Sequence, residues 1–176
     1  KADDLPCRIA GEVRDFDPCL YIDAGLKPAK RMSRASQFAV GATAMALRDA
    51  GMEVSSIQNL DEVTIIMGVS TSAMDLIAHT PRPWTSVSAI PHAVSSAVAF
   101  SLGFDARLLT VSNGCASGAD AIALGVSEIR RGASDIVIAG AADGAVTRYV
   151  FECFARARKL SQRNDEPERA SRPFDR

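Results

Sequence analysis

The sequence is poor in the residues that build several common kinds of site. It has two histidines and four cysteines in 176 residues, and no cysteine stands in the CxxC or CxxH spacing of a zinc site. The formal net charge is −1, so no excess of positive charge predicts binding to nucleic acid or to a membrane surface. No apolar run approaches the roughly 20 residues of a membrane span. We therefore expect no metal site, no nucleic-acid partner and no membrane anchor.

The remaining composition is that of an ordinary globular protein. Apolar residues make up 47% of the chain and charged residues 23%. The scattered cysteines predict free thiols in a reducing compartment, and we expect a cytoplasmic protein. Because the sequence starts without Met and stops after a charged, proline-containing stretch, we also expect it to be part of a longer polypeptide.

Apolar runs and helix-periodic segments alternate along the chain, which predicts an α/β layered architecture. Buried strands are predicted at residues 63–69, 108–112 and 134–142. Helices are predicted from Ser33 or Ser36 to about Ala50, from Pro91 to Leu102, from the residues after Cys115 to about Arg131, and from Thr147 to Ala157. Between Ile77 and Ala89, Pro81 and Pro83 argue against a helix and predict an ordered loop.

The stretch from Leu108 to Arg131 is typical of a buried strand that ends in a tight turn and becomes a helix, with Cys115 at the turn. A thiol at this place lies near the positive end of the helix dipole and near unpaired backbone N–H groups, which favour the nucleophilic thiolate. Gly114, Ser117 and Gly118 leave room for a substrate carbonyl. The alternative is that Cys115 is a small buried hydrophobic residue. The small residues of the following helix predict that it is covered on several sides.

A cluster of basic residues precedes the first long predicted helix. It comprises Lys27, Lys30, Arg31 and Arg34. Such a cluster is either a solvated face or a local docking patch for an acidic partner.

The order of several motifs resembles the β-ketoacyl-acyl carrier protein synthases, including the ketosynthases of polyketide synthesis. The motifs are VSNGCASGA around Cys115, EIRRG at 128–132, the strand 135–140, KLS at 159–161, RND at 163–165 and ASRPFD at 170–175. The resemblance implies a thiolase-like layered fold, α-β-α-β-α in a complete family member, of which residues 1–176 would form the amino-terminal part of the ketosynthase domain. The carboxyl-terminal half would then be absent.

The resemblance also implies a chemistry. Cys115 would accept an acyl group from a carrier protein's phosphopantetheine thiol, and decarboxylating malonyl carrier protein would then extend that group by two carbons. The backbone N–H of Cys115 would be one oxyanion donor, while the family's two catalytic histidines belong to the half that this chain lacks. His79 and His92 do not match their motifs and are interpreted as structural or loop residues.

The expected partners follow from the same resemblance. Lys27, Lys30 and Arg31 would dock an acidic acyl carrier protein, and no cofactor would be bound by the chain itself. The strand 108–112 would pair across a homodimer or a heterodimer with a related subunit. Two alternatives remain: a non-catalytic partner subunit or scaffold, and a thiolase-fold acyltransferase that uses coenzyme A thioesters. The segment 68–73 has fewer glycines than is common in the family, and Ala106-Arg107 replaces a common Gly-Pro.

Overall fold

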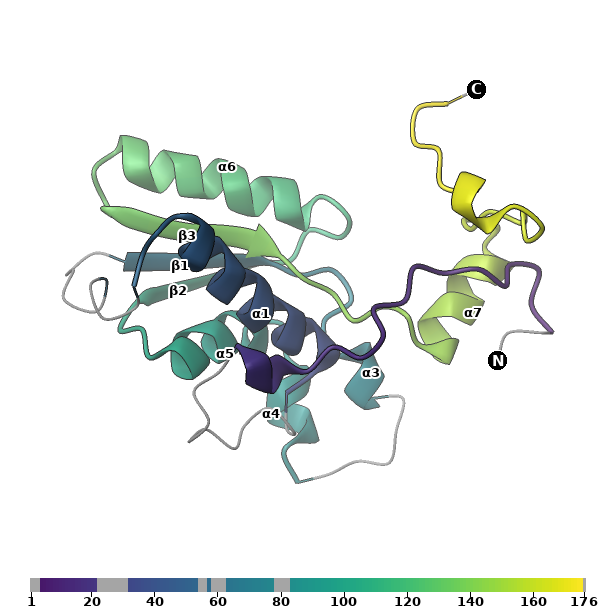
Figure 1. Ribbon diagram of the computed structural model, residues 1–176, viewed down its shortest axis with the longest axis horizontal. Helices are drawn as coiled ribbons and strands as arrows, with labels where there is room; N and C mark the ends of the chain where they lie inside the picture. Colours follow the sequence, from purple (N-terminus) through teal and green to yellow (C-terminus); the bar gives the residue numbers. More distant parts are fainter. Residues whose placement is uncertain (1–3, 22–31, 54–56, 58–62, 78–82, 176) are drawn as a thin grey trace. The chain divides into compact units, whose positions relative to one another are not determined.

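The structure is a computed structural model that describes residues 4–21, 32–53, 57, 63–77 and 83–175 (Figure 1). Two compact units are present. The larger comprises Asp17–Gly144, and the smaller comprises Lys1–Phe16 together with Ala145–Arg176. In the described residues, no helix is both long enough and apolar enough to cross a membrane.

A parallel sheet of three strands forms the centre of the larger unit. Its strands are β1 (Val63–Gly68), β2 (Arg107–Val111) and β3 (Ile136–Ala141), in the spatial order β2-β1-β3. Every residue of β1 is buried, because this strand is paired on both edges and covered on both faces. The three predicted strands and the α/β architecture are thus confirmed, with ends that differ by one or two residues.

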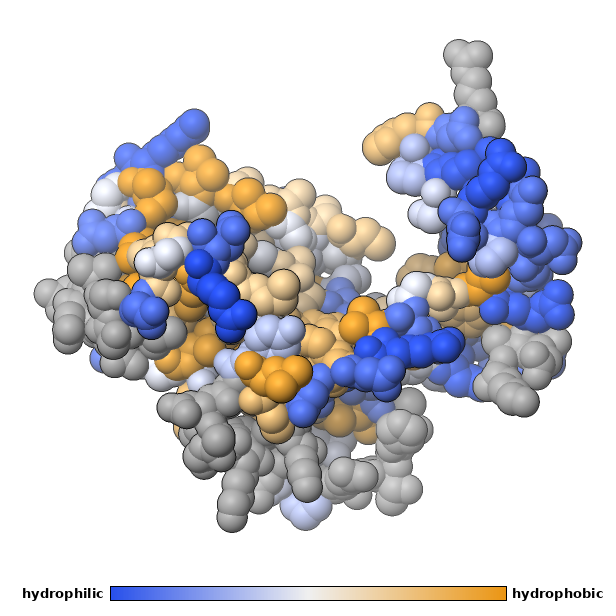
Figure 2. All heavy atoms as spheres, in the orientation of Figure 1, coloured by the Kyte–Doolittle hydropathy of each residue, from blue (hydrophilic) through white to orange (hydrophobic). Residues whose placement is uncertain are grey.

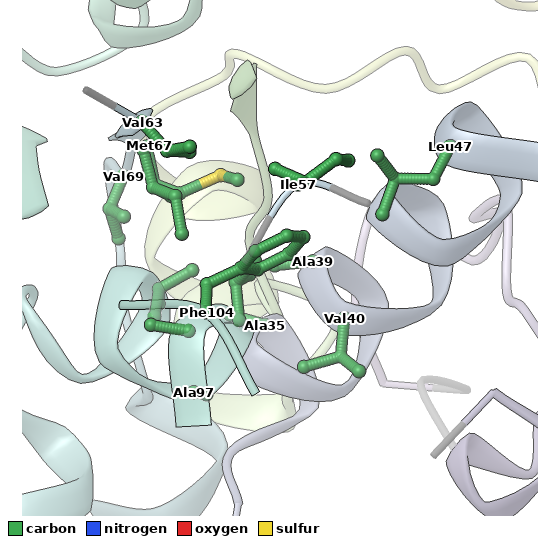
Figure 3. Packing of buried hydrophobic residues seen from close by; sticks show 14 residues of the cluster. Ala35, Ala39, Val40, Leu47, Ile57, Val63, Met67, Val69, Ala97 and Phe104 are labelled. Atoms are coloured by element: carbon green, nitrogen blue, oxygen red, sulfur yellow. The ribbon is translucent and has the colours of Figure 1, made fainter. Parts of the chain in front are cut away.

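Helices α1 (Arg34–Asp49) and α5 (Ala93–Leu102) cover one face of this sheet (Figure 1). Ser33 caps α1, because its Oγ accepts a hydrogen bond of 3.1 Å from the Ser36 backbone N–H. Gly103 ends α5 in the left-handed conformation, with φ of 74°. Both helix ends agree with the sequence prediction. Apolar side chains from both helices and β1 form the main core (Figure 3).

Helix α6 (Ser117–Arg130) lies on the opposite face of the sheet (Figure 1). Its small residues face the strands, and a Cβ on Gly125 would lie only 3.1 Å from the Cβ of Ala139. The other face is exposed, and Figure 2 shows hydrophobic residues gathered over this helix. The exposed apolar residues are Ile122, Val126 and Ile129. The prediction that this helix is covered on several sides is therefore wrong for this chain, since only its small-residue face is packed against the sheet.

One short helix corrects the prediction of a loop between Ile77 and Ala89, of which residues 78–82 lie outside the described residues. Helix α3 (Met74–Ile77) lies before that segment and shares only Ile77 with it. Helix α4 (Thr85–Ala89) forms the last five residues of the segment. Pro83 does not break α4, because it precedes the first helical residue and removes no backbone hydrogen bond from the helix. A one-turn 3-10 helix, η1 (Pro18–Leu20), also belongs to the larger unit.

The smaller unit contains the predicted helix near 147–157, α7 (Arg148–Arg156), which Thr147 caps, and the 3-10 helix η3 (Pro167–Arg169). Asn164 joins the two chain segments of this unit. Its side-chain oxygen accepts a hydrogen bond of 2.8 Å from the Arg8 N–H, and its Nδ2 donates one of 3.0 Å to the Pro6 carbonyl. A bidentate pair between Arg148 and Asp4 adds a second link. This pair lowers the pKa of Asp4 and raises that of Arg148.

Candidate active site

The loops that follow the three parallel strands meet at the carboxyl edge of the sheet. The Val69 N–H donates a hydrogen bond of 2.9 Å to the Val111 carbonyl, and the Ala142 N–H donates one of 3.2 Å to the Gly68 carbonyl. In open α/β sheets this edge is the usual place of a ligand site. Cys115 and Asp143 both belong to these loops.

Cys115 is exposed and immediately precedes Ala116, the residue that flanks the amino end of the 14-residue helix α6. Within the described residues, its sulfur has no hydrogen-bond partner, and its backbone forms an isolated β-bridge with Asn113. The predicted turn from strand to helix is confirmed, and the exposure agrees with a reactive thiol rather than a buried structural one. Its chemical role remains a prediction. By contrast, Cys7 in the smaller unit is buried.

Ser117 is the buried hydrogen-bonding centre of this turn, which the sequence analysis treated only as a small residue. Its side-chain oxygen accepts a 2.8 Å hydrogen bond from the Asn113 N–H. Its single hydroxyl proton has two acceptors, the Gly114 carbonyl at 2.7 Å and the Val69 carbonyl at the longer distance of 3.2 Å. Ser117 therefore connects the turn before α6 to the loop after β1. Its place as the first residue of the helix is the sequence signal for this role.

Gly114 and Gly68 are required by the geometry of the turn. Gly114 has a φ of +56°, which favours glycine. A Cβ on Gly68 would collide with the carbonyl of Ser117 and lie 2.7 Å from the Gly118 nitrogen. The end of β1 and the start of α6 are therefore in direct backbone contact.

Asn113 and Asp120 form a second link across the turn. The Asn113 Nδ2 donates a hydrogen bond of 2.8 Å to Oδ2 of Asp120, which lies in the first turn of α6. A carboxylate at this end of the helix also interacts favourably with the helix dipole. The backbone on both sides of Cys115 is thus tied to α6.

Asp143, directly after β3, binds the loop that follows β1. Its Oδ1 accepts three hydrogen bonds: from the Thr71 N–H at 2.7 Å, the Ser72 N–H at 2.9 Å and the Thr71 hydroxyl at 3.0 Å. Its Oδ2 accepts a fourth, from the Ser70 N–H at 2.9 Å. The sequence analysis missed this residue. The available signal was an acidic residue just beyond the end of a buried strand.

At the other end of α6, the buried carboxylate of Glu128 is held by two arginines. Arg131 donates to it at 2.5 Å and Arg107, the first residue of β2, at 2.8 Å. The hydrogen bond from Arg131 lowers the pKa of Glu128, assisted by the charges of both arginines and opposed by burial. The departure from Gly-Pro at Ala106-Arg107 therefore supplies a partner for a buried acid.

The predicted docking residues Lys27, Lys30 and Arg31 lie outside the described residues, as does His79. Arg34, at the start of α1, lies over the ring of Phe38 at 4.6 Å from its centroid. His92 is exposed and directly precedes α5, with no capping hydrogen bond from its side chain. No cluster of three or more histidine, cysteine or acidic residues that could hold a metal ion occurs in the part of the chain that the structure describes.

Comparison with known proteins gives one consistent match. The family described as "Beta-ketoacyl synthase, N-terminal domain" matches residues 1–176. The ketoacyl synthase alpha subunit of the tetracenomycin polyketide synthase of Streptomyces glaucescens is 34% identical over 96% of this chain and 43% of its own length. The 3-oxoacyl-[acyl-carrier-protein] synthase 2 of Synechocystis is 32% identical over 99% of this chain and 44% of its own length.

The same similarity is present in three dimensions. The crystal structure of a β-ketoacyl synthase from Burkholderia phymatum matches 97% of this chain and 44% of its own, with a TM-score of 0.83 and 27% identity. The chain thus has the ketosynthase fold, as predicted, and spans about half the length of the relatives that it matches.

Proposed function

Because this chain belongs to the β-ketoacyl synthase family, we propose that it takes part in carbon–carbon bond formation between an acyl group held on Cys115 and malonyl-acyl carrier protein. The observation that carries the proposal is a free and exposed thiol in the turn that leads into α6. Relatives from both fatty-acid and polyketide synthesis support the reaction class.

In the first step, the Cys115 sulfur attacks the carbonyl carbon of an acyl thioester on the carrier's phosphopantetheine. A new C–S bond forms, the carrier's C–S bond breaks, and the proton of Cys115 goes to the departing thiolate. Covalent capture divides one difficult reaction into two easier ones. The N–H of Cys115 would donate to the developing oxyanion, a contribution that is large only when the donor is already in position.

In the second step, the malonyl group on a carrier protein loses carbon dioxide, and its enolate carbon attacks the thioester on Cys115. A C–C bond forms, the C–S bond to Cys115 breaks, and the thiolate of Cys115 is regenerated. The family's two histidines for decarboxylation and enolate stabilisation would act from outside this chain. The residues described here would hold and present the acyl group.

The proposal includes two protein partners. An acidic acyl carrier protein would dock at Lys27, Lys30 and Arg31, and opposite charges would make this docking sensitive to salt. A homologous subunit, the same or a related one, would pair with β2. The outer edge of β2 supports this pairing, since in the described sheet it has no neighbouring strand, and Leu108 on it is exposed.

The test is to incubate the intact protein with an acyl-carrier protein and to locate the acyl group by mass spectrometry. We expect the mass of one acyl group on the peptide containing Cys115 and none after Cys115→Ala. Cys153→Ala is the matched control, because Cys153 is also exposed and free but lies in α7. Wild-type protein that leaves Cys115 unacylated would exclude the proposed function.

The same experiment separates the two alternatives. Transfer from acyl-coenzyme A at an equal or higher rate than from the carrier protein would identify a coenzyme A-dependent acyltransferase. A chain that is acylated by neither donor would be a non-catalytic partner subunit.

A further inference from the structure

We propose that Asp143 is a positioning residue for Cys115, acting through the loop 69–73; the inference rests on the acyl-transfer function proposed above. Asp143 has no role in the mechanism as stated, and its four hydrogen bonds are to Ser70, Thr71 and Ser72 rather than to Cys115. It controls instead the backbone against which the Cys115 turn is packed.

The Asp143 carboxylate accepts four hydrogen bonds from the loop that follows β1. Three consecutive backbone N–H groups, of Ser70, Thr71 and Ser72, and the Thr71 hydroxyl all point at Asp143. Hydrogen bonds to an ionised acceptor are stronger than neutral ones. Ser72 has a φ of +51°, which is unusual for a residue with a side chain. The loop is held by groups outside it: Asp143 accepts four hydrogen bonds from it, and the Ala89 carbonyl accepts one from the Ser72 hydroxyl at 3.0 Å.

The same loop is connected to the turn around Cys115. Val69 precedes the bound residues, and its carbonyl is the more distant of two acceptors of the Ser117 hydroxyl, at 3.2 Å. The same Ser117 oxygen lies 2.7 Å from the carbonyl of Gly114, the residue before Cys115. Because the end of β1 is in van der Waals contact with the backbone of Ser117, the loop cannot move without moving the start of α6.

The position of the Cys115 backbone N–H determines how well it can stabilise the oxyanion. An oxyanion donor is effective only if it is held within a few tenths of an ångström of its productive place, and a displacement of about 1 Å can cost roughly a hundredfold in rate. A loop released from Asp143 would displace the N–H of Cys115 while leaving the thiol present. The expected effect of losing Asp143 is therefore on kcat rather than on KM.

The decisive variants are Asp143→Ala and Asp143→Asn. We expect Asp143→Ala to lower kcat for acylation of Cys115 at least tenfold and to change KM less than threefold. Asp143→Asn keeps one oxygen for the three bonds that Oδ1 accepts, so it should recover part of the loss. The control is Asp135→Ala, which removes an exposed carboxylate just before β3, at the opposite end of that strand.

Hydrogen exchange and alkylation test the same inference without acyl transfer. In Asp143→Asn, the peptide that contains residues 70–72 should exchange faster, and the rate of Cys115 alkylation by iodoacetamide should change relative to that of Cys153 in the same molecule. Asp135→Ala should change neither. These two readouts also decide the matter if Asp143→Ala does not fold.

A double-mutant cycle tests whether the effect passes through Ser117. If it does, Asp143→Ala and Ser117→Ala together should lower kcat by less than the product of the single effects. The inference would be overturned if the two single effects on kcat multiplied in the double variant. It would also be overturned if kcat of Asp143→Ala lay within twofold of the wild-type value. Failure of the wild-type protein to acylate Cys115 would instead reject the proposed function and leave the exchange and alkylation results to judge Asp143.

Discussion

The Cα of Gly68, the last residue of β1, faces the carbonyl of Ser117, the first residue of α6, with no space for a side chain between them. The atoms on the other side of this contact belong to backbone, which cannot rotate away as a side chain can. This contact sets how closely the Cys115 turn approaches the central strand.

Gly68→Ala should therefore destabilise the fold by about 3 kcal/mol, the upper part of the range for an overpacked interior. The measurement is the free energy of unfolding in urea, with acylation of Cys115 as a second readout. Gly140→Ala is the matched control, because Gly140 also lies in a strand but a Cβ there would meet nothing within 4 Å. Equal destabilisation by both variants would contradict the steric explanation.

The sequence predicted the elements of this fold because their signals are local. The β-branched residues of β1, the capping serine Ser33 and the left-handed Gly103 act within one turn or one strand. The turn at Cys115 was predictable for the same reason, since a strand, a glycine and a helix follow one another directly.

The contacts between distant parts of the sequence were not predictable. Asp143 is 71 to 73 residues from the three residues that it binds, and Glu128 is 21 residues from Arg107. Such contacts exist only once the order β2-β1-β3 is known. The exposed face of α6 could not be predicted either, because a stripe of small and apolar residues does not say which side is covered.

Glu128→Gln should remove the pH-dependent contribution of Glu128 to the free energy of unfolding. The pKa of Glu128 in the folded protein is below its ordinary value of 4.5, so its contribution is complete above that pH and is lost as the pH falls through the folded value. Wild type should be more stable than the variant near neutral pH, and the difference should vanish in acid. Urea midpoints between about pH 7 and pH 3 measure this.

The control for that series is Glu152→Gln, which removes the half-buried partner of the exposed Arg156 in α7. Solvent-exposed pairs contribute little, so its effect on the midpoint should be smaller. A difference between wild type and Glu128→Gln that grows as the pH falls would contradict the assigned direction of the pKa shift.

Thr64 and Ser134 should behave as a coupled pair. Their hydroxyl oxygens are 2.6 Å apart and both side chains are buried, so either single change leaves one hydroxyl without its partner. Thr64→Val and Ser134→Ala should each cost about 1–2 kcal/mol, and the double variant should cost less than their sum. Thr64→Val combined with Ser127→Ala, on the exposed side of α6, should be additive.

Ser33→Ala should destabilise the larger unit by about 1 kcal/mol through the loss of the cap of α1. Its Oγ also donates to Ser36 Oγ at 3.0 Å, and the residue is fully buried. Thermal unfolding measures the effect, with Ser127→Ala as a helical control that should be neutral or slightly stabilising. A loss of stability in the control alone would contradict the capping role.

The parallel sheet separates the chain's connections into two groups with different tolerance to change. Turns that lead into the strands, such as the one at Gly132, lie at the edge opposite to Cys115, and Gly132 itself is exposed with a φ of +67°. Exposed turns of this kind accept inserted residues well. A fluorescent reporter or affinity tag placed at Gly132 would therefore leave the Cys115 turn undisturbed, whereas the same insertion after β1 would separate Asp143 from the loop that it holds.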